Sequence, residues 1–399
     1  MRAPVLASLA SVVLVAACGR VGYDTLGGDD GIDAAVDDAR VDDAEIDAPG
    51  APPGVLTTCG DAVLVQDFGP AQSASFYGLD VAATSTGFVV AWSAGADMIR
   101  ATGLAVNSGP RLEVIQLSAD IVSEQDAVMS IAAIGDDAML GVDDPGGPGI
   151  WLFALDERGL ERSTTKYIDT ARAYGHDFVM ADPVSDIFVV MGANGTSTAS
   201  EAYTRDHDIH PLTGPHAAFT VGTESAAAVK VNGGYMLMTG NSSNCDVKKV
   251  DAAFAAVGSP QPVNMTCHHA SLAAPVGSNN VVAGWNCDND AVWVTAGDLS
   301  GALPGERAVY GDSSNSASNP RLAVTNAGVW YGFQVTGGRL GVALVDATGA
   351  VVAGNDAAVV HTSANLRAYD LAVWGNVAFL FWLDSSTRTE LWAMKLCGA

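Results

Sequence analysis

The sequence predicts an all-β fold built from seven similar units, and three observations lead to this prediction. One short apolar run occurs seven times, and each copy starts 46 to 50 residues after the last. Small residues precede each copy, and turn-forming residues follow it. The last unit is one strand short. A period of roughly 40 to 50 residues with several short strands is typical of a β-propeller, in which one repeat forms one four-stranded blade.

The apolar runs are expected to form the second strand of each blade. They are apolar at consecutive positions because neighbouring blades would cover each blade on both faces. A β-sandwich followed by further β-domains is the alternative fold, but it does not account for the even spacing. The seven copies are residues 88–92, 138–142, 187–191, 235–239, 281–285, 329–333 and 377–381.

A polar residue opens each unit ahead of a run of small residues, which we expect to form the innermost strand. A ring of these residues at one mouth of the central channel could bind a cation, or a cationic or polyhydroxylated ligand. The alternative is structural: each side chain accepts backbone hydrogen bonds where the chain enters the strand. The seven candidates are Asp80, Asp126, Asp177, Glu224, His269, Asn319 and Asp370.

Turn signals end the third strand of several units. Residues 155–159 and 345–349 place an Asp at the start of a tight turn and a Gly where a positive φ is needed. In the third unit, residues 206–210 read Asp-His-Asp-Ile-His. These are metal-ligand residue types, but a solvated hairpin loop is the expected structure, and no metal site is predicted.

The short last unit has a donor for its missing outer strand. Residues 61–67 precede the first unit and would complete the last blade, which closes the ring and removes two open sheet edges. This pairing would bring Cys59 near Cys397, and we expect a disulfide between them in an exported protein.

Three further cysteines, Cys245, Cys267 and Cys287, fall in the fourth and fifth units. One pair is expected to form a disulfide, and the sequence leaves open which pair. A zinc site with His268, His269 and Asp288 alongside the cysteines is the alternative, but the sequence has no CxxC or HxxxH spacing to support it.

Residues 1–17 predict a leader peptide, with Arg2, an apolar core at 5–15 and a small-residue cleavage site at 16–17. Residues 14–18, Leu-Val-Ala-Ala-Cys, resemble the lipobox of bacterial lipoproteins. The resemblance implies that Cys18 is lipidated and anchors the chain to the cell envelope without spanning the membrane. Gly19 follows in place of an Asp, so the resemblance points to the outer membrane. An ordinary secretory leader is the alternative.

Residues 18–54 are expected to be an acidic tether, followed by the propeller domain at 55–399. Ten acidic residues and one Arg lie between Asp24 and Asp47. Such a segment cannot bury enough apolar surface to offset its ordering entropy, so we expect an extended, solvated spacer.

The composition narrows the possible functions. A formal net charge of −26 disfavours nucleic acid and gives no attraction to anionic lipid headgroups. No P-loop, HExxH or Rossmann fingerprint is present, so no cofactor is predicted.

A surface-tethered binding or scaffold module is therefore the preferred interpretation, with a glycan, a cation or a protein as its partner. The alternative is a hydrolase or lyase that acts on polysaccharide with two ring carboxylates. A third possibility is a subunit of an envelope assembly. The resemblance to propellers is architectural, without the WD40 or kelch signatures, and therefore implies no particular function.

Overall fold

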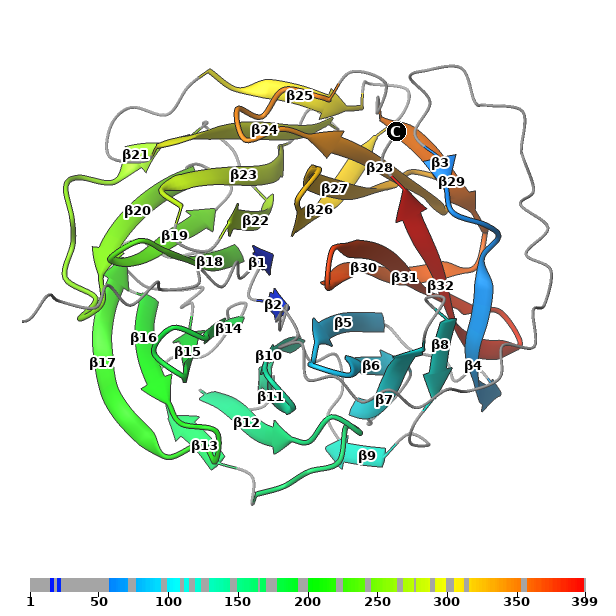
Figure 1. The fold of residues 1–399 in the computed structure, drawn as a ribbon, viewed down its shortest axis with the longest axis horizontal. Helices are drawn as coiled ribbons and strands as arrows, with labels where there is room; N and C mark the ends of the chain where they lie inside the picture. Colours follow the sequence, from blue (N-terminus) through cyan, green and yellow to red (C-terminus); the bar gives the residue numbers. More distant parts are fainter. Residues whose placement is uncertain are drawn as a thin grey trace, which may run out of the picture.

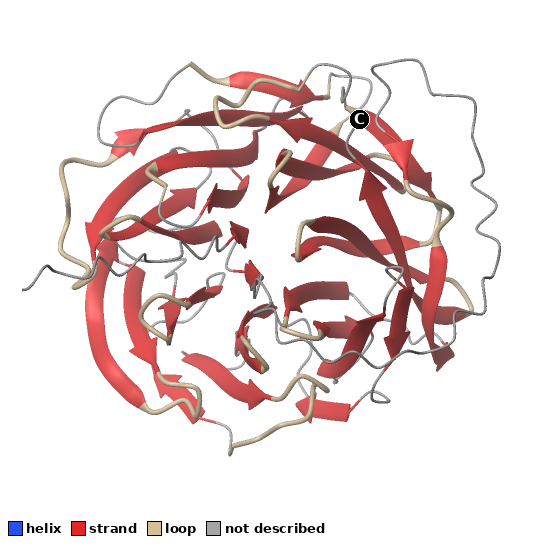
Figure 2. Cartoon of the chain, in the orientation of Figure 1, coloured by secondary structure: helices blue, strands red, loops and turns tan. Residues whose placement is uncertain are grey.

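The seven-bladed propeller predicted from the repeat is confirmed by a computed structural model. All regular elements in the described part of the chain are strands, and they group into seven sheets around a central axis (Figure 1, Figure 2). Within this part, no helical segment has the length and apolar character needed to cross a membrane. The structure describes residues 15–17, 20–22, 57–70, 77–94, 99–107, 111–114, 119–122, 129–143, 149–163, 166–169, 178–192, 200–219, 225–240, 245–263, 268–275, 278–287, 291–298, 305–311, 316–352 and 357–397.

Blades 1 to 3 are antiparallel sheets of consecutive strands, numbered outward from the axis (Figure 1). Blade 1 contains β5 (Tyr77–Ala83), β6 (Gly87–Ala94), β7 (Ile99–Asn107), β8 (Arg111–Val114) and β9 (Ala119–Val122), of which β8 and β9 both pair with β7. Blade 2 contains β10 (Met129–Ile134), β11 (Asp137–Asp143), β12 (Gly149–Leu155) and β13 (Lys166–Asp169). Blade 3 contains β14 (Phe178–Asp182), β15 (Ile187–Gly192), β16 (Ser200–Arg205) and β17 (Pro211–Phe219).

Blades 4 to 6 repeat this order. Blade 4 contains β18 (Ser225–Val231), β19 (Gly234–Gly240), β20 (Cys245–Asp251) and β21 (Gln261–Pro262). Blade 5 contains β22 (His268–Pro275), β23 (Asn280–Cys287), β24 (Ala291–Asp298) and β25 (Arg307–Tyr310). Blade 6 contains β26 (Ala317–Thr325), β27 (Gly328–Val335), β28 (Arg339–Val345) and β29 (Ala358–Thr362).

A short hairpin from the N-terminal region lies inside the ring (Figure 1). Its strands are β1 (Val15–Ala17) and β2 (Arg20–Gly22), and β1 pairs with residues 273–275 of β22, the end of that strand nearest its turn to β23. The predicted cleavage before Cys18 would remove β1 from the mature chain. Cys18, Gly19 and residues 23–54 of the predicted tether lie outside the described residues.

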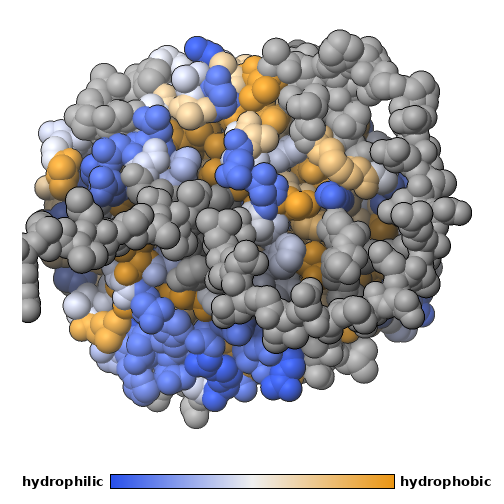
Figure 3. All heavy atoms as spheres, viewed as in Figure 1, coloured by the Kyte–Doolittle hydropathy of each residue, from blue (hydrophilic) through white to orange (hydrophobic). Residues whose placement is uncertain are grey.

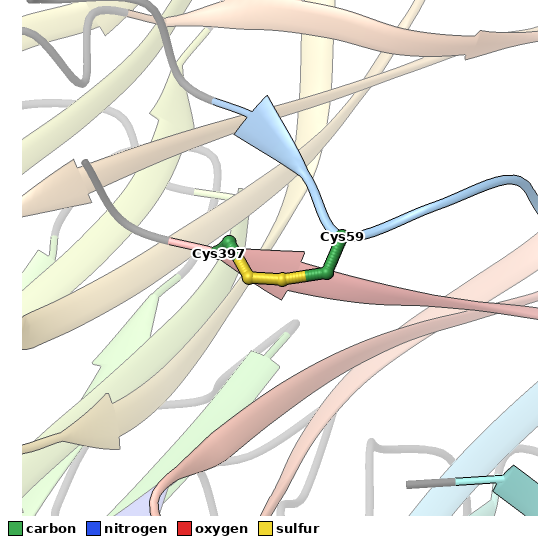
Figure 4. The surroundings of a disulfide bond; sticks show 2 residues. All are labelled: Cys59 and Cys397. Carbon is green, nitrogen blue, oxygen red and sulfur yellow. A yellow bond between two sulfur atoms is a disulfide. The ribbon is translucent and has the colours of Figure 1, made fainter. Parts of the chain in front are cut away.

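Blade 7 closes the ring as predicted. Its strands β30 (Leu366–Trp374), β31 (Val377–Ser385) and β32 (Arg388–Cys397) come from the C-terminus. The outer strands are β3 (Thr57–Thr58) and β4 (Val63–Pro70), which both pair antiparallel with β32. The predicted disulfide joins Cys59 to Cys397 beside this pairing, with their Cα atoms 5.5 Å apart (Figure 4).

The hydrophobic core lies between neighbouring blades, because the second strands are covered on both faces. Phe88 of blade 1 is fully buried and packs edge-on against Phe379 and Phe381 of blade 7, at ring-centroid distances of 5.3 and 5.1 Å. Phe68 of the closing strand stacks on Trp92 of blade 1 at 3.8 Å. The closing strand therefore seals the junction between the last and the first blade.

The predicted turns after the third strands form around one aspartate each. In the turn at Asp156, its Oδ1 accepts the backbone N–H of Arg158 and of Leu160, and Gly159 has a φ of 77°. The turns that start at Asp206, Asp251 and Asp346 have the same hydrogen bonds.

Two of these turns hold an apolar residue at the position that a glycine occupies in the turns at Asp156 and Asp346. Ile209 and Phe254 have φ values of 69° and 62°, in the left-handed region that glycine favours. Both side chains are buried in the core. Burial of a large apolar side chain contributes about 1.5–3 kcal/mol, which offsets a left-handed backbone strain of about 1–2 kcal/mol.

A buried ion pair joins blades 3 and 4. The Nζ of Lys230 lies 2.7 Å from Oδ2 of Asp182, and the Tyr235 hydroxyl donates to the same oxygen at 2.7 Å. Burial alone would raise the pKa of Asp182, but the hydrogen bonds from Lys230 and Tyr235 outweigh it and hold that pKa below its ordinary value of 3.8. Asp182 therefore stays charged at neutral pH.

Removing the closing disulfide is expected to destabilise the domain by about 2–5 kcal/mol, because the bond joins residues 338 positions apart and restricts the unfolded chain. Urea unfolding of the Cys59→Ser/Cys397→Ser variant measures this loss. The parent protein with a reducing agent serves as the control and should lose at least as much stability. An unchanged urea midpoint in the variant would show that β4 alone holds the ring closed.

Replacing Lys230 with Met should cost about 3–5 kcal/mol at pH 7, because Asp182 would be left as a buried charge without its cation. Lys249→Met, on the half-buried third strand of blade 4, is the matched control and should cost far less. Since the pKa of Asp182 is lowered in the folded protein, the contribution of the pair is complete above about pH 4 and is lost as the pH falls through the folded value. The difference between parent and variant, measured by urea unfolding, should therefore narrow in acid; a constant difference would contradict this account.

Candidate functional site at the channel mouth

Two of the described ring candidates, His269 and Asn319, lie where the innermost strands of blades 5 and 6 begin. β22 and β26 each contain a bulge there, between His268 and Ser271 and between Ser318 and Arg321. His269 and Asn319 occupy these bulges with φ values of 50° and 52°. The two residues therefore take the same position and the same unusual backbone conformation in neighbouring blades.

Each of these side chains pairs with an amide on the second strand of its own blade. His269 Nδ1 lies 3.1 Å from Oδ1 of Asn286, and Nδ2 of Asn319 donates to Oε1 of Gln334 at 3.3 Å. His269 is exposed, whereas Asn319 and Gln334 are half-buried. This edge of the ring thus holds one imidazole and three carboxamides, of which that of Asn286 is buried.

Blade 7 adds a phenol and a guanidinium to this edge. The Tyr369 hydroxyl donates to the backbone carbonyl of Asn319, which links blade 7 to blade 6. Arg367 lies at a third bulge, and its Nη2 donates to the carbonyl of Ser385 at 3.3 Å. We call His269, Asn286, Asn319, Gln334 and Arg367 the mouth.

The two described ring carboxylates serve a different purpose. Asp80 and Asp370 are buried, at 7% and 0% exposure. Oδ2 of Asp80 accepts the N–H of Ile131 in blade 2, and Oδ2 of Asp370 accepts the N–H of Val81 in blade 1, both at 2.6 Å. Each carboxylate therefore links the inner strand of one blade to that of the next. At these two positions the side chain accepts a backbone hydrogen bond, as the structural alternative to ligand binding expects.

The same link between blades 2 and 3 comes from a serine. Ser130 Oγ accepts the N–H of Val179 at 3.1 Å. Arg321 of blade 6 adds a further link to blade 7, since its Nε lies 3.6 Å from Oδ1 of Asp370.

The candidates Asp126, Asp177 and Glu224 lie outside the described residues, so ligand binding by them stays a prediction.

Two of the three cysteines, one in blade 4 and one in blade 5, lie at the same edge of the ring. Cys245 begins β20 and Cys287 ends β23, both at the edge where the inner strands begin. Cys267 and the side chains of Cys245 and Cys287 lie outside the described residues. The predicted disulfide among the three cysteines therefore stays a prediction.

The opposite face carries a polar network between blades 2 and 3, and Figure 3 shows hydrophilic residues gathered over this part of the ring. The ring nitrogens of His207 lie 2.6 Å from Oδ2 of Asp137 and 3.1 Å from Oδ1 of Asp186. Arg162 pairs with Asp137 and with Asp208. Among the residues that the structure describes, no group of three or more His, Cys, Asp or Glu is placed to hold a metal ion.

Sequence reasoning missed the amide partners in the mouth. Asn286 and Gln334 directly follow the apolar runs 281–285 and 329–333, at the same repeat position. Aligning the repeats shows a carboxamide at this same position in two consecutive units, so the sequence does contain a signal for these residues. Arg367 lies at a bulge that interrupts the repeat count, and no sequence signal identifies it.

The mouth can exchange hydrogen bonds with a polar ligand. Carboxamides and an imidazole both donate and accept, which suits hydroxyl-rich ligands. A general acid–base pair needs two carboxyl groups at a fixed separation, and both described ring carboxylates already accept backbone hydrogen bonds. The two described ring carboxylates are therefore engaged in links between blades.

The fold and the mouth define a seven-bladed propeller with a polar edge. No protein family matches this chain, and no curated protein is similar to it in sequence. BBS1N, solved in complex with ARL6DN, is 10% identical with a TM-score of 0.49, covering 86% of this chain and 97% of that one. Hydrazine synthase of Kuenenia stuttgartiensis is 10% identical with a TM-score of 0.49, covering 84% and 98%. The Dos1 propeller is 11% identical with a TM-score of 0.47, covering 86% and 94%.

These identities concern the fold alone, and the assignment of the fold rests on the strand pairing of this chain.

Replacing Asp80 with Ala should destabilise the domain by about 1–3 kcal/mol, because the buried N–H of Ile131 would lose its acceptor. Asp80→Asn keeps an acceptor oxygen and should cost clearly less. Urea unfolding of both variants measures the difference. Equal stability of Asp80→Ala and the parent would mean that the carboxylate is free for another role, such as ligand binding.

Proposed function

We propose that this protein is a lipid-anchored binding module of the bacterial cell envelope, held at the outer membrane through Cys18 and the acidic tether. The anchor is supported by the lipobox-like residues 14–18. The binding function is supported by one observation above all, the repeated pairs His269–Asn286 and Asn319–Gln334 at the mouth.

The path of the closing strand bears on how the anchored module would be oriented. Thr57 lies opposite Cys397, and Leu396 lies opposite Ala378, close to the turn between β30 and β31. His269 and Asn319 lie at the other ends of the strands, where β22 and β26 begin. A tether that joins the propeller just ahead of Thr57 would therefore leave the mouth pointing away from the membrane.

The module would take a glycan, a cation or a protein as its partner. The hydrolase or lyase alternative rests on carboxylates of blades 2 to 4 that lie outside the described residues, and no described contact favours it. The proposed function therefore needs no cofactor and no turnover.

Two measurements on the full chain test this proposal. In cells fed labelled palmitate, the parent should incorporate label and Cys18→Ser should not; equal labelling would exclude lipidation at Cys18. For binding, we expect soluble peptidoglycan fragments, lipopolysaccharide or calcium to raise the melting temperature of the parent. That shift should fall by at least half in His269→Ala/Asn319→Ala. A shift that persists in full in this variant would move the site away from the mouth, and no shift with any probe would contradict the binding function for these classes.

A further inference from the structure

An aromatic row crosses blade 7 on the side that faces blade 6. Tyr369, Trp382 and Trp392 lie directly opposite one another on β30, β31 and β32. The two indole rings stack with centroids 6.5 Å apart and planes 9° from parallel. Trp382 is fully buried, whereas Trp392 is only half-buried. The row therefore runs from the core toward the outer rim, where Leu64 of β4 lies opposite Trp392.

Polar groups from both blades border this row. His361 on β29 of blade 6 packs over Trp382, with ring centroids 4.4 Å apart. Its Nε2 lies 3.7 Å from Oδ2 of Asp384, and the two side chains are 20% and 19% exposed. Glu390 lies opposite Asp384 and accepts a hydrogen bond from Nε1 of Trp392 at 3.3 Å. We call His361, Trp382, Asp384, Glu390 and Trp392 the interblade cluster.

Three polar atoms of the interblade cluster have no hydrogen-bond partner among the described residues. They are Nε1 of Trp382, Nε2 of His361 and Oδ1 of Asp384. Buried polar atoms are nearly always hydrogen-bonded in folded proteins, and an unmade bond costs about 1–3 kcal/mol. These three atoms lie around one pair of stacked rings, so a ligand that reached them could form hydrogen bonds with all three.

The mixture of donors and acceptors narrows the ligand class. An indole N–H can only donate, and a carboxylate oxygen can only accept, so a ligand that satisfies both must itself accept and donate. A hydroxyl group does both. A quaternary cation would suit the aromatic rings and the carboxylates, but it could not accept from Trp382. An aromatic face beside hydroxyl-binding groups suits a sugar ring, whose C–H face is apolar.

We infer that the interblade cluster binds a saccharide between blades 6 and 7. This inference rests on the proposed binding function but places a site apart from the mouth. The ring face of the sugar packs against Trp392, and its hydroxyls exchange hydrogen bonds with Asp384 and His361. The unpaired atoms are shielded in the unliganded protein, so His361 moves off Trp382 when the sugar enters.

Blade 5 offers a matched control. Trp285 and Trp293 lie opposite each other on β23 and β24, as Trp382 and Trp392 do in blade 7. Their indole N–H groups also have no partner among the described residues. The backbone carbonyl of Trp293 accepts the Tyr331 hydroxyl at 2.8 Å. This indole pair lacks a described neighbouring carboxylate and imidazole like Asp384 and His361, so it separates the effect of a tryptophan from that of the cluster.

Calorimetric titration of the full chain with glucose, galactose, mannose, fucose and N-acetylglucosamine tests the inference, with choline as the cationic probe. At least one sugar should bind, and Trp392→Ala and Asp384→Ala should each weaken that binding at least tenfold. Trp293→Ala and the mouth variant His269→Ala/Asn319→Ala should bind it as the parent does. Trp392→Phe keeps an aromatic face and should retain most of the affinity even if Trp392→Ala fails to fold.

Binding of choline but of no sugar would overturn the ligand class. Sugar binding that is unchanged in Trp392→Phe, Trp392→Ala and Asp384→Ala would overturn the site. Sugar binding that is lost only in the mouth variant would overturn this inference while supporting the proposed function. No binding of any sugar would overturn the inference and leave the peptidoglycan, lipopolysaccharide and calcium arms of the proposed function to be judged separately.

Discussion

Closure of the ring is the constraint on which the rest of this structure depends. A blade has two apolar faces, and only another blade can cover each of them. Blades 2 to 6 receive both neighbours from the chain order, whereas the junction of blades 1 and 7 joins the two ends of the domain, and β4 crosses it to pair with β32. Phe68 on that strand then packs against Trp92 of blade 1. The contacts of Phe88 with Phe379 and Phe381, and the hydrogen bond from the Val81 N–H to Asp370, join the same two blades.

The ring also explains why its inner polar residues are structural. Near the axis the blades are crowded, so a backbone N–H at the start of an inner strand cannot reach water. Asp80, Asp370 and Ser130 provide the acceptors at three consecutive junctions. The groups proposed to contact a ligand lie instead at bulges near the strand ends, as His269 and Asn319 do, or between blades 6 and 7.

The repeat period was enough to predict the blades, the order of their strands and the closing strand with its disulfide, because burial on both faces leaves a strong apolar pattern. It could not assign the polar positions. In blade 2, Ser130 and not an aspartate accepts the hydrogen bond from the next blade. Bulges in blades 5 to 7 also change the strand register around His269, Asn319 and Arg367, so a fixed repeat period does not align these residues. Contacts between blades, such as that of His361 with Trp382, join residues whose separation in sequence carries no signal.

The position of the disulfide has a mechanical consequence. Cys59 follows β3 and precedes β4, and its partner Cys397 ends β32. A pull on the chain ahead of Thr57 therefore passes through a covalent bond into β32 before it reaches the first hydrogen bond between β4 and β32. The closing strand cannot be peeled away residue by residue from its N-terminal end. A propeller held by that end would resist detachment with the strength of a covalent bond, and not with that of one β-ladder.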